Sequence, residues 1–126
     1  MFPFVMNYDL QSRHPGAHAA FLQQAQARGL SSWTDCGGEM LQLPNTTVTG
    51  HFPNMAAAEA AFDAALAAAR AEIWSPIILT KRFTIQQAGP GNVISNNRRP
   101  KLSLADLFRK YPPALSALAR LGQIRA

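Results

Sequence analysis

The stretch that decides the fold is residues 2–10, which read FPFVMNYDL. Its apolar and aromatic residues Phe2, Phe4, Met6 and Tyr8 stand at every second position, the period of a β-strand with one buried face. Asp9 follows them, just before the polar, breaker-rich residues 11–16. We therefore expect a first strand that ends in a carboxylate, held at a fixed position on the rim of a sheet.

The patterns that follow this strand alternate between helical and extended. Two segments are helical: residues 14–28, with Pro15 in the first turn and Gly29 after the end, and residues 55–74, with Asn54 as the cap. Extended segments are expected at residues 30–36, 39–43, 46–52 and 77–86, with Gly37-Gly38 as a kink between the first two. Strict alternation in the last segment places Ile77, Leu79, Lys81 and Phe83 on one side.

This order of elements, strand, helix, two strands, helix, strand, predicts an α+β fold. It is the order of the ferredoxin-like βαββαβ sandwich, in which two helices cover one face of a four-stranded antiparallel sheet. The expected strands carry apolar residues on both sides, so the other face also needs a cover. We expect a homodimer stacked on that face, with the C-terminal extension as the competing cover.

The 126 residues, 48% of them apolar, suffice for one compact domain, expected at residues 1–89. Residues 90–126 are expected to form a basic C-terminal extension with a short edge strand at 93–95, irregular chain at 96–100 and two short helices, one beginning near Ser103 and one at 114–121. No apolar run approaches a membrane span, and the N-terminus lacks the features of a signal peptide. We therefore expect a cytoplasmic protein with no membrane partner. The single Cys36 excludes an intramolecular disulfide and a thiolate zinc site within one chain.

The positive charge is concentrated near the end of the chain. The net charge is +5, yet the residues from 98 onward hold seven basic residues against one acidic residue, and the residues before them hold five against six. Such a segment attracts phosphate backbones or acidic partners, and the alternative is a solvated tail. The candidate RNA- or DNA-binding residues are Arg13, Arg98, Arg99, Lys101, Arg109 and Lys110.

Asp9 is the candidate catalytic and metal-binding residue. A carboxylate at a strand end can bind Mg²⁺, alone or with a twofold mate, and the alternative is that it caps the following turn. His14 and His18 have the i, i+4 spacing of metal ligands but lack a third ligand. Asp35, Cys36 and Glu39 surround the glycine kink and join a site with Asp9 only if that kink folds toward it.

The aromatic residues Tyr8, Trp33 and Trp74 either stack on bases or belong to the core. No Ser/His/Asp constellation and no phosphate-binding glycine loop stands out in the sequence.

Two short motifs carry a family resemblance. Residues 5–10, VMNYDL, and residues 43–48, LPNTTV, resemble the CRISPR-associated adaptation endoribonuclease-like proteins and the related virulence-associated protein D toxins, a likeness that covers residues 2–88. The resemblance implies a ferredoxin-like protomer, a homodimer, and Asp9 as the metal-associated acidic residue near its twofold mate. The chain departs from the CRISPR family where Arg13 replaces a basic cluster and where residues 33–36, WTDC, fill the second strand.

Three functional hypotheses follow. The first is a small dimeric protein of the defence or toxin–antitoxin type, catalytically inert, that binds nucleic acid or a protein partner. The second is a Mg²⁺-dependent endoribonuclease or phosphodiesterase that uses Asp9. The third is a regulatory domain that binds a small molecule on its sheet. The fold is compatible with all three and does not decide whether the protein is an enzyme.

Overall fold

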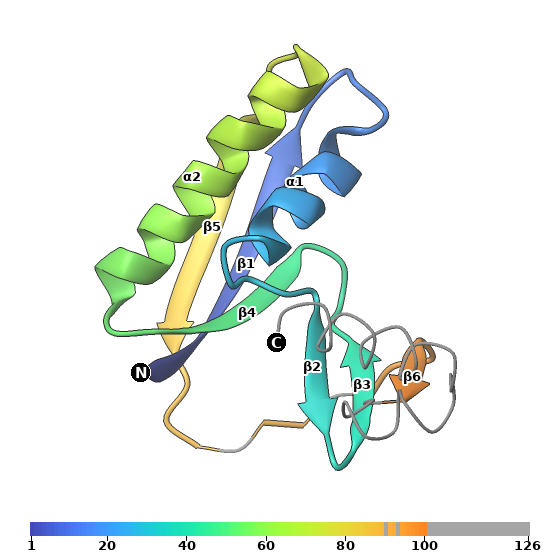
Figure 1. Ribbon diagram of the computed structural model, residues 1–126, viewed down its shortest axis with the longest axis vertical. Coiled ribbons are helices and arrows are strands. Elements are labelled where there is room, and N and C mark those ends of the chain that lie inside the picture. Colours follow the sequence, from blue (N-terminus) through green and yellow to red (C-terminus); the bar gives the residue numbers. More distant parts are fainter. Residues whose placement is uncertain (90, 93, 101–126) are drawn as a thin grey trace, which may run out of the picture.

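The computed structural model describes residues 1–89, 91–92 and 94–100. Over these residues the protein is an α+β fold with two helices and two three-stranded antiparallel sheets (Figure 1). We call β4-β1-β5 sheet A and β2-β3-β6 sheet B. The elements are β1 (Phe2–Gln11), α1 (Ala17–Gln26), β2 (Trp33–Cys36), β3 (Glu39–Gln42), β4 (Thr47–Phe52), α2 (Met55–Ile73), β5 (Ile78–Gln86) and β6 (Arg98–Pro100).

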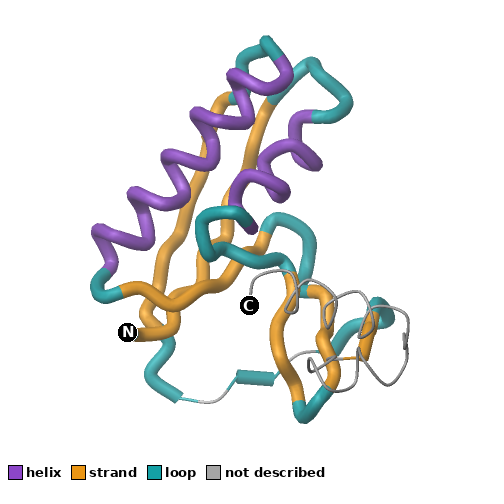
Figure 2. Tube along the Cα trace, in the orientation of Figure 1, coloured by secondary structure: helices purple, strands orange, loops and turns teal. Residues whose placement is uncertain are grey.

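Both helices lie against one face of sheet A (Figure 2). The side chains of Phe4, Met6 and Tyr8 on β1 are buried there, as the alternation in residues 2–8 predicts. Tyr8 meets Phe21 of α1 and Phe62 of α2 with ring centroids 5.0 and 5.3 Å apart. These aromatic contacts join both helices to the central strand and form the middle of the core.

Helix α2 begins where the sequence predicts. The Asn54 side chain accepts a hydrogen bond from the Ala57 amide at 2.8 Å and caps the helix. Its buried residues Ala58, Phe62, Ala65, Leu66 and Ala69 recur at helical spacing, and the many small side chains allow a close approach to sheet A.

The described residues form two three-stranded sheets in place of the predicted four-stranded ferredoxin-like sheet. The chain beside β4 forms only the isolated bridge Ser31 to Thr49, with N···O distances of 2.8 and 2.9 Å. Gly37 and Gly38, both with positive φ, close a tight turn, so that β2 forms its ladder with β3. Strand β2 pairs with β3 alone among the described strands and does not extend sheet A.

Three local predictions also need correction. Strand β1 continues past Asp9 to Gln11, so Asp9 does not end the strand. The sequence predicts a short edge strand at residues 93–95 and irregular chain at 96–100. In the structure, the short edge strand is formed by residues 98–100, which pair with β3. The pairing of β1 with β5 shifts register between Asp9 and Leu10, which pair with Lys81 and Leu79. This bulge puts Leu79 against the core and Lys81 on the opposite side, because it reverses the alternation.

The two helices predicted after residue 102 lie outside the described residues. Neither α1 nor α2 is long and apolar enough to cross a membrane.

Candidate functional site

The face of sheet A that faces away from the helices is the main candidate surface. Residues that pair across an antiparallel sheet point to the same side, so the register places Val5 with Ile85 and Thr49, Asn7 with Phe83 and Thr47, and Asp9 with Lys81. We call this surface the open face. It comprises Val5, Asn7, Asp9, Thr47, Thr49, Lys81, Phe83 and Ile85.

Two large apolar side chains of β5 are exposed on the open face. Phe83 is 62% exposed and Ile85 is 42% exposed, and Val5 beside them is half-buried. Ile78, at the start of the same strand, is also exposed. A row of this kind on a sheet is typical of a surface that another molecule covers.

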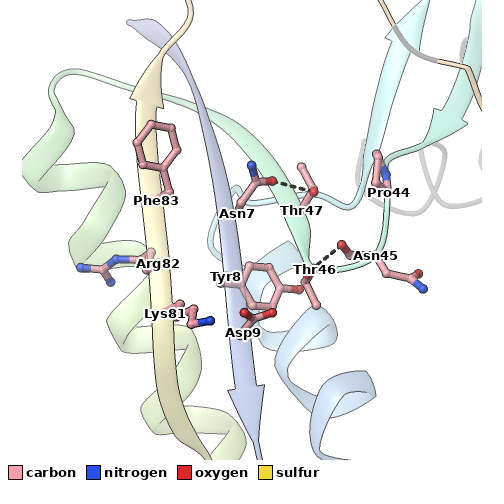
Figure 3. Close-up of a pocket in the computed structure, with 10 residues that line it drawn as sticks. All are labelled: Asn7, Tyr8, Asp9, Pro44, Asn45, Thr46, Thr47, Lys81, Arg82 and Phe83. Carbon is pink, nitrogen blue, oxygen red and sulfur yellow. Dashed lines mark hydrogen bonds between the residues drawn. The ribbon is translucent and has the colours of Figure 1, made fainter.

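The depression that contains Asp9 lies at one end of the open face (Figure 3). It has a volume of about 580 Å³ and is lined by Asn7, Tyr8, Asp9, Pro44, Asn45, Thr46, Thr47, Lys81, Arg82 and Phe83. The Thr47 hydroxyl donates a hydrogen bond to Asn7 Oδ1 at 2.8 Å. The Thr46 carbonyl accepts from the Tyr8 amide at 3.0 Å and holds the rim of the depression to β1.

Asp9 and Lys81 are the charged groups of this depression on the open face. They stand opposite each other in the register, and the side chain of neither forms a hydrogen bond or an ion pair with any described residue. Both side chains are exposed. The carboxylate and the ammonium are therefore available to a ligand or to a second subunit.

The described residues contain no group of three or more His, Cys, Asp or Glu side chains that could hold a metal ion. His14 and His18 make separate contacts: His18 Nε2 lies 3.0 Å from the Tyr8 hydroxyl, and His14 Nδ1 accepts from the Gly16 amide at 2.9 Å. Asp9 therefore lacks protein co-ligands in this part of the chain.

Burial raises the pKa of the Tyr8 phenol above its ordinary value.

Asp35, Cys36 and Glu39 do not join Asp9. Asp35 and Cys36 line a separate cavity of about 480 Å³ together with Val5 and Thr49. Glu39 lies 3.7 Å from Arg98 Nη1 on the neighbouring strand.

The structure places the candidate nucleic-acid-binding residues in two regions. Arg13 lies in the loop between β1 and α1, at the top of Figure 1, and Arg98 and Arg99 lie in β6, at its lower right. The Arg99 guanidinium stacks 4.3 Å from the centroid of the Trp33 ring. Lys101, Arg109 and Lys110 lie outside the described residues.

Sequence reasoning missed the exposure of Phe83 and the contacts of Arg82. Arg82 points to the helix side of β5, where its guanidinium lies 5.2 Å from the Phe62 ring centroid and 2.7 Å from an Asp63 carboxylate oxygen. The alternation of the strand does place Lys81 and Arg82 on opposite sides, as the structure has them.

Searches against protein-family models, curated proteins and solved structures give no match for this chain.

Proposed function

We propose that the protein is a small homodimer that associates with nucleic acid and does not cleave it, with the two copies stacked through the open face of sheet A. The observation that carries the proposal is the exposed pair Phe83 and Ile85 on the face of sheet A opposite the two helices. A twofold axis would place both residues of one subunit against the same surface of the other.

Each side chain adds a modest free energy to such a contact, and it adds this free energy twice because both subunits contribute the same residue. Full burial of a Phe or Ile side chain contributes roughly 1.5–3 kcal/mol, and about half of each side chain is still exposed, so each adds about 1 kcal/mol per subunit. Val5 and the aliphatic stem of Lys81 would add to this area.

The proposal includes a ferredoxin-like relationship for the protomer. The strand order β4-β1-β5 and the bridge of Ser31 beside β4 support this relationship, with the fourth strand withdrawn into sheet B. The resemblance of residues 5–10 and 43–48 to CRISPR-associated and virulence-associated D proteins supports a role in defence or toxin–antitoxin systems.

The nucleic-acid contact is assigned to β6 and to the residues that follow it. Arg98 and Arg99 are exposed, and residues 101–126 hold five basic residues against one acidic residue. The expected signature is binding that weakens as salt is raised, because phosphate contacts release condensed counterions.

The test is retention of a labelled single-stranded RNA by the full-length protein over a series of salt concentrations. Arg98→Gln with Arg99→Gln should lower the slope of log affinity against log salt by about 1.4, or roughly 0.7 for each phosphate contact. Arg28→Gln is the matched control, since this arginine is bound to Gln24 on α1 at 2.8 Å and should leave the slope unchanged. Retention that does not depend on the salt concentration, or an unchanged slope in the double variant, would contradict the assignment of the nucleic-acid contact to β6.

The second candidate function is a Mg²⁺-dependent phosphodiesterase, favoured by one observation. The Asp9 side chain is exposed on the open face, so a stacked dimer with its axis near Asp9 would bring two carboxylates together. Cleavage of RNA or DNA by the wild type with Mg²⁺, abolished in Asp9→Asn with the dimer intact, would establish this function. Absence of cleavage in both proteins would support the inert dimer.

A further inference from the structure

Trp74 combines two unusual properties. Its side chain is 93% exposed, and its backbone is left-handed, with φ 52° and ψ 40°, at the C-terminal end of α2. Glycine or asparagine ordinarily occupies this position, because the left-handed conformation costs free energy in residues with a bulky side chain. Since the indole is almost fully in water, burial in the folded chain does not compensate that cost. Backbone strain without a packing benefit points to a function outside the fold.

A depression lies between the loop before α1 and the loop that follows Trp74. The Ser12 hydroxyl donates to the Pro76 carbonyl at 2.8 Å and joins the loop before α1 to the loop after α2. Both loops lie at the top of Figure 1. They line a depression of about 540 Å³, within the range of pockets that hold small ligands, formed by Gln11, Ser12, Arg13, Ser75, Pro76 and Ile78.

The charge at this end is complementary to phosphate. Arg13 is exposed and forms no hydrogen bond or ion pair with the described residues. Arg70, one helical turn before Trp74, uses its Nε to donate to the Ile77 carbonyl at 2.8 Å. Glu72, the acidic residue of this last turn, accepts from Gln24 Nε2 at 3.3 Å. The depression thus holds the Arg13 guanidinium and begins at Ser75, the residue after the exposed Trp74.

We propose that this end of the molecule binds single-stranded nucleic acid, with one base stacked on Trp74 and a neighbouring phosphate held by Arg13. The inference rests on the proposed association with nucleic acid and adds the substrate class and a second contact region. Stacking on an exposed aromatic ring requires an unpaired base, because bases within a duplex already stack on one another. Trp74 directly follows α2, and the helices lie on the face opposite the open face, so stacking two open faces would leave this end of α2 uncovered.

The test uses tryptophan fluorescence of the full chain. Trp33→Phe leaves Trp74 as the single tryptophan, because the sequence contains only two. Single-stranded oligonucleotides of uridine or thymidine should quench this emission in step with their retention, and a duplex of the same length should not. In the wild-type background, Trp74→Leu should weaken single-strand affinity by about 5- to 100-fold, and Arg13→Gln should weaken it and lower the salt slope by about 0.7.

Trp74→Gly separates this binding role from a structural role. Glycine relieves the left-handed backbone and removes no buried contact, so the melting temperature should rise while single-strand affinity falls. A lower melting temperature would contradict the strain argument. Salt-sensitive retention with no quenching and no loss in Trp74→Leu would overturn this inference and leave the proposed function standing. If the wild type retains no nucleic acid at any salt concentration, the proposed function itself fails.

Discussion

Replacing Gly50 with alanine is the sharpest test of how closely the chain at Gly29 approaches β4. A Cβ atom at this position would overlap the Gly29 carbonyl oxygen and would lie 2.8 Å from Phe52 Cε2. The Gly29 carbonyl cannot retreat freely, because the next residues are held by the Leu30 amide on the Ala25 carbonyl at 2.9 Å and by the two bonds between Ser31 and Thr49. The extra methyl group must therefore displace backbone atoms near Gly29.

The expected loss of stability combines two effects. Forcing a methyl group into a filled space costs roughly 1–3 kcal/mol, and weakening the two hydrogen bonds of the Ser31–Thr49 bridge costs about 0.5–1.5 kcal/mol each. The lower entropy of the unfolded alanine chain offsets roughly 0.5–1 kcal/mol of this. We expect the free energy of unfolding to fall by about 2–4 kcal/mol.

Urea unfolding followed by circular dichroism measures this change, with equal m-values as the condition for comparing the proteins. Gly89→Ala is the control, since a Cβ there meets no atom within 4 Å and the backbone φ is not in the left-handed region. It should stay within about 0.5 kcal/mol of wild type. A Gly50→Ala protein as stable as the control would refute the close approach of the chain at Gly29 to β4.

Four further predictions concern buried and exposed polar contacts of the fold. Thr84 Oγ1 is buried and finds no hydrogen-bond partner among the described residues, so Thr84→Val should raise the free energy of unfolding by about 1 kcal/mol in the same urea assay. Because burial raises the pKa of Tyr8, the folded protein keeps its phenol neutral where the unfolded chain ionises, so stability should fall as the pH rises above about 10. Tyr8→Phe should flatten that part of the melting-temperature profile, and an equal decline in both proteins would contradict the assignment. Arg82→Gln should cost about 1 kcal/mol, since this half-buried guanidinium bonds an α2 carboxylate at 2.7 Å. Arg98→Gln, with both partners exposed, should change stability by less than about 0.5 kcal/mol.

The layers of sheet A could be predicted from local patterns. The two-residue period gave the correct buried face of β1 for Phe4, Met6 and Tyr8, whereas Phe2 at the start of the strand is exposed. The apolar spacing around Phe62 gave α2 nearly to the residue. Both patterns are local, because the polarity of each side chain indicates the face of the strand or helix on which it lies.

The pairing of β2 and the bulge in β5 could not be predicted in the same way. The Gly37-Gly38 turn fixes the pairing of residues 33–36 with β3. Whether residues 33–36 also pair with β4 depends on hydrogen bonds between segments farther apart in the sequence, which no local pattern reports. A one-residue bulge then moved Lys81 and Phe83 away from the side of Leu79. The candidate site was affected most, since the exposure of Phe83 follows from that bulge.

The mass of the protein in solution tests the central claim most directly. Light scattering coupled to size-exclusion chromatography should give twice the chain mass of 13.7 kDa for the wild type, and the chain mass for a folded Phe83→Lys variant, because a buried lysine in the contact is strongly unfavourable. Ile94→Lys is the control, since Ile94 is 91% exposed and lies outside the open face, and it should remain dimeric. A wild type that is monomeric at all accessible concentrations, or a Phe83→Lys variant that is still dimeric, would contradict the stacking of two open faces.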